Sequence, residues 1–180
     1  MYQIETDRLI IRPIQATDYN ELREIILDPI VVKYTRYREV KTPDDFSDIF
    51  KNHFLNNAST FGIEIKVSHE LIGFYEFHAE DKTGILTYAL AQNSWGKGYV
   101  AEVGKAMMSY SFENLNFDRI EAHYASLNPR SGKVMAKMGM QDLGSIDTFE
   151  VPETGEIHQV MAYVLTKDDW LIKSQQKRAI

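Results

Sequence analysis

The chain has 180 residues, a length that fits one domain better than two, so we expect a single domain over residues 1–180. It contains no cysteine, which excludes a disulfide scaffold, a thiolate metal site and a cysteine nucleophile. The net charge of −6 disfavours nucleic acid as a partner and suits a cationic acceptor, although such a charge can serve solubility alone. No apolar run approaches the roughly 20 residues of a membrane span, and the first residues do not form a signal peptide. We therefore expect a cytoplasmic protein that contacts no membrane.

The first third of the chain is expected to contain one strand and two helices. Thr17 is the predicted cap of the first helix, and Asp28-Pro29 ends it. Pro43 suits the first position of the second helix. The expected ranges are 4–13 for the strand, 18–27 and 42–57 for the helices, and 30–41 for an irregular segment between them.

The remainder alternates strands with helices. Three strands at 60–67, 71–78 and 85–91 predict an antiparallel meander, and the longest helix is expected at 99–114. A strand at 119–127, a short helix at 131–138 and two strands at 142–151 and 157–166 follow. This order predicts an α+β fold, in which a single mixed, mostly antiparallel twisted sheet carries helices on both faces.

The segment 92–99, Gln-Asn-Ser-Trp-Gly-Lys-Gly-Tyr, joins a predicted strand to the longest predicted helix. The first N–H groups of a helix lack internal partners and carry partial positive charge, so a phosphate can bind there. Gly96 and Gly98 would let the backbone approach phosphate oxygens without obstruction by a Cβ atom. A Gly-x-Gly sequence before a helix is also compatible with an ordinary flexible turn. Because it lacks a third glycine and a Gly-Lys-Ser/Thr sequence, it is neither a dinucleotide fingerprint nor a P-loop.

A second segment of the same kind, 128–140, also follows a predicted strand and opens a helix. With it, the chain resembles the GCN-five-related N-acetyltransferase (GNAT) superfamily, and more closely its RimJ/RimL-like branch. The matching pieces run in order over about residues 4–170. They are Thr6-Asp7-Arg8-Leu9-Ile10-Ile11-Arg12-Pro13, Leu71-Ile72-Gly73, Trp95-Gly96-Lys97-Gly98-Tyr99 with Ala101-Glu102, Arg119-Ile120-Glu121-Ala122, Asn128-x-x-Ser131 and Lys137-Met138-Gly139-Met140. Two positions depart from the family pattern, since Asn93 replaces a Gln or Arg and Met140 replaces a Phe.

The resemblance implies that acetyl-CoA is the cosubstrate. Separately, no metal is expected, because no group of His, Asp and Glu residues has the spacing of metal ligands. The resemblance also implies that backbone near Leu90, Ala91 and Gln92 pairs with the pantetheine arm, and that Asn128 contacts this arm too. The diphosphate would bind at Trp95, Gly96, Lys97, Gly98, Tyr99, Val100 and Ala101. Lys133 could meet the adenosine phosphates, although a lysine on a solvated surface explains this residue equally well.

Glu76 is the candidate general base, because alternation places it mid-strand on the same face as Phe74 and His78. Apolar neighbours would raise its pKa toward neutrality, although Glu76 could equally be a surface acid. His78 is the second choice, and Glu121 and His123 are weaker candidates. Ser131 is the candidate general acid by its match to the family motif, and it could also bind to the cofactor or simply cap a helix.

The partner is expected to be an amine acceptor, either a protein N-terminus, ribosomal proteins being the branch's named substrates, or a small molecule such as an amino acid, a polyamine or an antibiotic. A non-catalytic acyl-CoA-binding module on the same fold is the alternative from another functional class. Aromatic residues could line the amine pocket or belong to the core, and for the Phe residues the core is favoured; they are Tyr34, Tyr37, Phe50, Phe54 and Phe149. A homodimer is possible.

Overall fold

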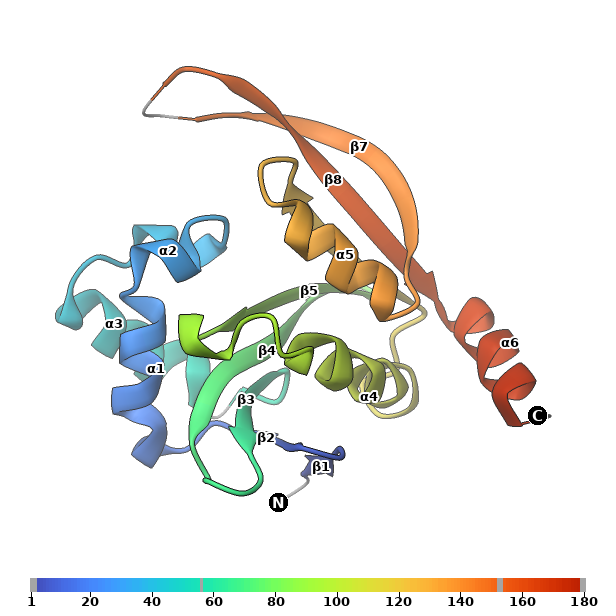
Figure 1. Ribbon diagram of the computed structural model, residues 1–180, viewed down its shortest axis with the longest axis horizontal. Coiled ribbons are helices and arrows are strands. Elements are labelled where there is room, and N and C mark those ends of the chain that lie inside the picture. Colours follow the sequence, from blue (N-terminus) through green and yellow to red (C-terminus); the bar gives the residue numbers. More distant parts are fainter. Residues whose placement is uncertain (1–2, 56, 152–153, 179–180) are drawn as a thin grey trace. The chain divides into compact units, whose positions relative to one another are not determined.

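The computed structural model describes residues 3–55, 57–151 and 154–178 (Figure 1). Its contacts divide the chain into two compact units. The N-terminal unit comprises Met1–Phe77 with Thr87–Ala106, and the C-terminal unit comprises His78–Leu86 with Met107–Ile180. The prediction of one domain over residues 1–180 stays a prediction.

The strands of the N-terminal unit follow one another in chain order as neighbours in a sheet. β2 (Leu9–Pro13) pairs antiparallel with both β1 (Ile4–Glu5) and β3 (Thr60–Ile65), and β3 pairs antiparallel with β4 (Leu71–Glu80). β5 (Thr83–Leu90) is the neighbour of β4. The single strand expected at 4–13 is therefore wrong in one respect, since the chain turns back at residues 6–8 and makes two paired strands.

The helical segments of this unit are short. They are η1 (Ala16–Asp18), α1 (Tyr19–Ile26), α2 (Pro29–Val32), η2 (Arg36–Glu39), α3 (Pro43–Ile49), the π-helical turn η3 (Phe50–Phe54), η4 (Gln92–Ser94) and the beginning of α4 (Tyr99–Glu113). Thr42 accepts a hydrogen bond from the amide of Asp45 and Pro43 takes the first helical position, as predicted. Thr17 does not cap α1, because it lies inside η1, and Asp18 stands before Tyr19 instead.

The segment expected to be irregular, 30–41, instead contains two short helical elements. Asp28 caps α2 by accepting hydrogen bonds from the amides of Ile30 and Val31, so Asp28-Pro29 begins a new helix as well as ending the preceding one. Thr35 in turn accepts a hydrogen bond from the amide of Tyr37 and so caps η2. Side-chain caps of this kind satisfy amides that lack a partner within a short helix.

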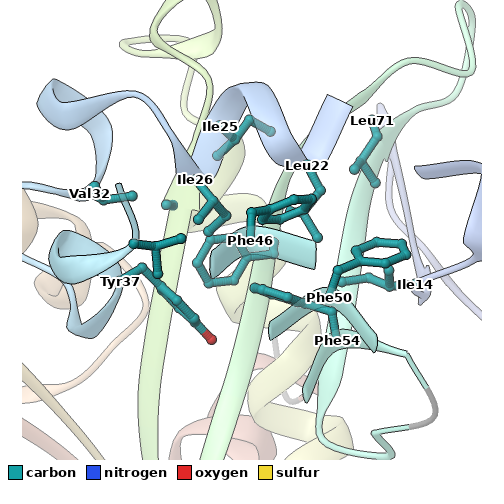
Figure 2. Close-up of a cluster of buried hydrophobic side chains, with 13 residues drawn as sticks. Ile14, Leu22, Ile25, Ile26, Val32, Tyr37, Phe46, Phe50, Phe54 and Leu71 are labelled. Atoms are coloured by element: carbon teal, nitrogen blue, oxygen red, sulfur yellow. The ribbon is translucent and has the colours of Figure 1, made fainter. Parts of the chain in front are cut away.

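A cluster of apolar side chains joins these helices to the sheet (Figure 2). Its members come from α1, α2, α3, η2 and η3 on one side, and from β4 and β5 on the other, where Phe74 and Ala89 contribute. Phe46, Phe50 and Phe54 are buried within it, which confirms the core assignment of Phe50 and Phe54. The same assignment is wrong for Phe149, which is only partly buried. Tyr37 packs there too, with its hydroxyl oxygen at the end of the ring that points away from Val32. This packing fixes the backbone of η2 and η3 over β4.

The C-terminal unit contains β6 (Arg119–Ala125), α5 (Pro129–Lys137), β7 (Gln141–Glu150), β8 (Ile157–Thr166) and α6 (Lys167–Arg178). β6 pairs parallel with β5 through Thr83–Leu86 and antiparallel with β8, and β8 pairs antiparallel with β7. Pro129 starts α5 two residues earlier than predicted, and α6 was not predicted at all. Because β4 and β5 pass through both units, the described strands form one sheet in the order β1-β2-β3-β4-β5-β6-β8-β7. This confirms the predicted fold class, a mixed and mostly antiparallel sheet with helices.

Candidate active site

The turn before α4 has the geometry that the glycines at 96 and 98 suggest. Both have left-handed backbone conformations, with φ of 77° at Gly96 and 81° at Gly98. A Cβ atom added to Gly96 would have no heavy atom within 4 Å, so this stretch of backbone faces open space. The carbonyl of Gly98 accepts the first bond of α4 from the amide of Glu102 at 3.1 Å. The amides of the residues between them, 99–101, therefore have no partner within the helix.

Arg8, which lies just before β2, braces this turn. Its Nη1 donates to the carbonyl of Lys97 at 3.0 Å, its Nε donates to Glu102 Oε2 at 2.7 Å, and its guanidinium lies 4.6 Å from the centre of the Tyr99 ring. Thr6 Oγ1 also donates to Glu102, at 2.6 Å. Partial burial acts to raise the pKa of Glu102, but the hydrogen bonds from Thr6 and Arg8 outweigh it and hold the pKa below its ordinary value. Arg8 therefore connects the turn to the start of β2 through its ion pair with Glu102 and its contact with the Tyr99 ring.

At the end of β5, most backbone groups already make hydrogen bonds within the protein. The indole of Trp95 donates to the carbonyl of Leu90 at 2.8 Å, and the amide of Ala91 donates to the carbonyl of Ile72 at 2.9 Å. The carbonyl of Ala91 accepts from the amide of Ser94 at 2.9 Å. The side chain of Gln92 donates to Asp28 Oδ2 at 2.6 Å. A ligand that pairs with this edge must therefore use a second lone pair or a group outside this set.

Glu76 lies on β4 beneath the helical layer, and its side chain is 2% exposed. Its Oε2 accepts from the hydroxyl of Tyr37 at 2.7 Å and lies 2.8 Å from His53 Nε2. Its Oε1 is buried with no hydrogen-bond partner among the described residues, and the nearest cation, Arg36 Nε, is 3.8 Å away. The prediction of an apolar environment is wrong, because polar and charged side chains from η2 and η3 surround this carboxylate.

Tyr37 is the neutral donor of this group. Burial first, and then the negative charge of Glu76, raise the pKa of the Tyr37 phenol. The phenol therefore keeps its proton at physiological pH and can donate to Glu76. His53 is more exposed to solvent than Glu76, since 28% of its side chain is exposed and only 2% of the Glu76 side chain is.

The second strand-to-helix junction belongs to the C-terminal unit. Asn128 precedes α5, and its Nδ2 lies 3.5 Å from Ser131 Oγ. Ser131 occupies the third position of α5, and Lys133 is exposed one turn into this helix. The helix packs closely on β6 at Gly132, where an added Cβ would lie 2.7 Å from the Tyr124 ring. These residues form a helix start of the same type as the one at α4.

Comparisons with known proteins identify the family of the chain. The profile of the family described as "Acetyltransferase (GNAT) domain" matches residues 8–141. The chain belongs to this family. It is 29% identical to a Bacillus licheniformis protein named "Uncharacterized N-acetyltransferase p20" over 177 residues, which cover 94% of the chain and 99% of that protein. It is also 27% identical over 122 residues to the Escherichia coli "[Ribosomal protein uS5]-alanine N-acetyltransferase", covering 66% of the chain and 62% of that protein.

Solved GNAT structures share the fold. A GNAT-family acetyltransferase from Bacillus anthracis matches with a TM-score of 0.81 and 25% identity, covering 93% of the chain and 99% of that protein. A spermidine N-acetyltransferase from Vibrio cholerae, solved with CoA and spermine, matches with a TM-score of 0.74 and 20% identity, covering 91% and 98%. Together with the family match, the relatives named N-acetyltransferases support an N-acetyltransferase enzyme.

The other candidates for the general base in this GNAT protein have different surroundings from Glu76. His78, the second choice for the base, is exposed. Glu121 bonds to Arg119 and lies 3.0 Å from His123, an arrangement in which ion pairing explains all three side chains. Among the described residues, no three or more His, Cys, Asp or Glu side chains are grouped so that they could hold a metal. None of the helices in the described ranges is long and apolar enough to cross a membrane.

Sequence reasoning missed His53, Arg36 and Arg8. His53 stands 23 positions from Glu76, and Arg8 stands 94 positions from Glu102. Neither pair has a spacing that a single element could bring together. Only Arg8 carried a signal, because it belongs to the motif at 6–13 that resembles the family.

Proposed function

We propose that this GNAT enzyme transfers an acetyl group from acetyl-CoA to a primary amine, by direct attack of the amine on the thioester. The observation that carries the proposal is the open, left-handed turn at Gly96 and Gly98, ahead of three amides that have no partner within α4. Such a helix start favours a diphosphate. The cosubstrate supplies the activated acyl group, and the chain's own residues bind it and handle protons.

The cofactor contacts follow the same logic. The backbone of Trp95, Gly96, Lys97, Gly98, Tyr99, Val100 and Ala101 would hold the diphosphate. The end of β5 at Leu90, Ala91 and Gln92 would pair with the pantetheine arm through those groups that still have capacity, and Asn128 would add a contact. Ser131 would give a proton to the departing sulfur, and Lys133 would meet the adenosine phosphates.

The acceptor must lose a proton before it can attack. At pH 7 this costs about 1.4 kcal/mol for an α-amine and about 4.6 kcal/mol for a lysine-like amine, from their ordinary pKa values. A general base therefore helps the reaction of either amine, and the lysine-like amine needs it more. The cluster around Glu76 is the proposed source of that base.

The α-amine of a protein is our first candidate for the acceptor, and with it membership of the RimJ/RimL-like branch. Support comes from the partial match to the uS5-alanine acetyltransferase, which is named for such an acceptor. A small amine is the competing outcome of the test. A peptide with a free N-terminal alanine, its N-acetylated form and spermidine should be compared in a thiol-release assay. Release with the free peptide alone supports the first acceptor, and release with spermidine alone supports the second.

A thermal-shift titration with CoA tests binding separately from turnover. Stabilisation by CoA without thiol release from any amine would indicate a non-catalytic acyl-CoA-binding protein. Absence of stabilisation would overturn the proposed site.

A pair of glycine variants makes this titration specific to the turn. Gly96 and Gly144 have φ of 77° and 76°, and an added Cβ meets nothing within 4 Å at either position. Each change to alanine should cost about 1–2 kcal/mol of stability, because left-handed backbone is unfavourable for alanine. Only Gly96→Ala should also weaken CoA binding, by roughly tenfold if one amide contact of about 1.4 kcal/mol is lost. Isothermal titration calorimetry measures the difference, and equal CoA affinity in both variants would contradict the assignment.

A further inference from the structure

The Glu76 carboxylate is poorly placed to take a proton from a substrate itself. Its side chain is 2% exposed, its Oε1 is buried, and its Oε2 already contacts both Tyr37 and His53. A general base must come within hydrogen-bonding distance of the proton that it removes. An amine could reach Glu76 only by displacing the side chains that cover it.

His53 offers what Glu76 lacks. Its Nε2 lies 2.8 Å from Glu76 Oε2, and an ionised carboxylate can only accept, so the ring proton belongs on Nε2. Nδ1 then carries the basic lone pair, and it has no hydrogen-bond partner in the described part of the chain. The His53 side chain is 28% exposed and that of Glu76 is 2% exposed, so the histidine is the more accessible base of the pair.

The local fold holds the imidazole in this orientation. His53 lies in the π-helical turn η3, which the amide of Leu55 closes on the carbonyl of Phe50 at 2.9 Å. Phe50 and Phe54 are buried in the core, and the Phe54 ring meets the imidazole edge-on at 5.3 Å. π-Helical turns are rare and are frequent at functional sites. The Tyr37 ring is also near the imidazole, with ring centres 6.2 Å apart.

We propose that His53 Nδ1 is the atom that removes a proton from the acceptor amine, and that Glu76 acts through it as a positioning residue. This inference rests on the proposed function. Among the described residues, the charged and titratable groups in contact with the imidazole are Glu76 from β4 and Tyr37 from η2, and Arg36 from η2 lies 3.8 Å from Glu76. Glu76 fixes the ring and stabilises the imidazolium that forms, while Tyr37 fixes Glu76.

The proton balance is complete without a further reagent. The acceptor arrives as an ammonium and gives one proton to Nδ1, which leaves a neutral amine. The amine nitrogen then bonds to the acyl carbon and the carbon–sulfur bond breaks. Ser131 gives its proton to the departing sulfur and takes the second amine proton in return, so the products are an amide and a thiol. His53 returns its proton to solvent.

The experiment begins with the wild-type enzyme and the amine from the thiol-release comparison that supports turnover. His53→Ala should lower kcat by about 10²-fold or more, with the KM for acetyl-CoA changed less than twofold. Added imidazole should restore part of the rate, because the vacated site is partly open to solvent. His69→Asn is the matched control, since His69 also pairs with a buried glutamate, and it should keep the wild-type rate. Asparagine tolerates the left-handed φ of 57° at that position.

The pH profile separates a chemical from a structural role. In the wild type, kcat/KM should rise with pH, because only a neutral imidazole can accept the proton of the amine. In His53→Ala, the rate should rise only as the amine itself loses its proton, at higher pH, whereas His69→Asn should keep the wild-type profile. Unchanged kcat in His53→Ala, or a loss that imidazole does not restore, would overturn the proposal. Inactivity of the wild type with every amine would instead reject the proposed function.

A spectroscopic readout needs neither turnover nor a stable His53 variant. Long-range ¹H–¹⁵N correlation of the imidazoles should give the Nε2–H tautomer for neutral His53, and Glu76→Gln should weaken this preference. An Nδ1–H tautomer in the wild type would contradict the proposed geometry. Should His53→Ala fail to fold, His53→Gln replaces it in the rate comparison.

Discussion

Two glutamate–histidine pairs in the N-terminal unit look alike in composition and differ in their surroundings. Glu64 contacts His69 at 2.6 Å and Glu76 contacts His53 at 2.8 Å, and both carboxylates are buried. Glu64, however, also contacts Arg12 at 2.6 Å, and Arg12 in turn binds Asp18 through two hydrogen bonds. Glu76 has its arginine only at 3.8 Å.

The difference separates a structural network from a reactive pair. Hydrogen bonding to Asp18, together with Glu64, raises the pKa of Arg12, which is a permanent cation enclosed between two carboxylates. His69 adds little to such a network, since its side chain is 74% exposed. At Glu76 the histidine at 2.8 Å is the closest basic partner, and the arginine, at 3.8 Å, makes no close ion pair with the carboxylate. The environment of the carboxylate, and not the residue types, decides what the histidine can do.

The largest expected effect is on stability, when the arginine near each glutamate is replaced. Arg12→Leu should lower the free energy of unfolding by about 3–5 kcal/mol, because it leaves Asp18 and Glu64 buried without a counter-charge. Arg36→Leu should cost about 1 kcal/mol or less, because Arg36 is half exposed and distant from its partner. Urea denaturation measures both. Equal losses would remove the contrast between the two sites.

The second effect is on rate. Glu76→Gln should lower kcat by about 10²-fold, since a neutral amide cannot stabilise the imidazolium of His53. Glu64→Gln should leave kcat within twofold of the wild type when assayed well below its melting temperature. Steady-state kinetics with the active amine provides the measurement. A comparable loss of kcat in both variants would mean that Glu76 acts on stability alone.

The smallest expected effect is a loss of stability at acidic pH. Burial acts to raise the pKa of Glu64, but hydrogen bonds from Arg12 and His69 prevail and lower it. A carboxyl whose pKa is lower in the folded state contributes stability above its unfolded pKa, and this is lost as pH falls through the folded pKa. The wild type should therefore lose more stability between pH 5 and pH 3 than Glu64→Gln. Urea denaturation at several pH values shows this, and parallel pH curves would be inconsistent with it.

Local sequence signals predicted much of the fold and one half of the site. Thr42-Pro43 gave the start of α3, the glycines gave the turn before α4, and alternation along β4 placed Glu76 on the face of Phe74. These features depend on neighbours within a few residues. The helix α6 was not predicted, because Trp170-Leu171-Ile172 is a continuous apolar run without helical periodicity.

The partners of Glu76 could not be predicted in this way. The π-helical turn shifts the register of the helix at Phe50–Phe54, so regular helical spacing misplaces His53. Tyr37 and Arg36 lie in a segment that appeared irregular, because its caps at Asp28 and Thr35 act over very short helices. The roles of Ser131, Asn128 and Lys133 stay predictions.

The bond from the Trp95 indole to the carbonyl of Leu90 gives the protein a built-in optical probe. The sequence has two tryptophans, and the other, Trp170, lies on α6. Replacing Trp170 with phenylalanine would leave a single fluorophore at the turn proposed to bind the diphosphate. Its emission would then report each occupation of that turn in real time, without a label or a coupled assay.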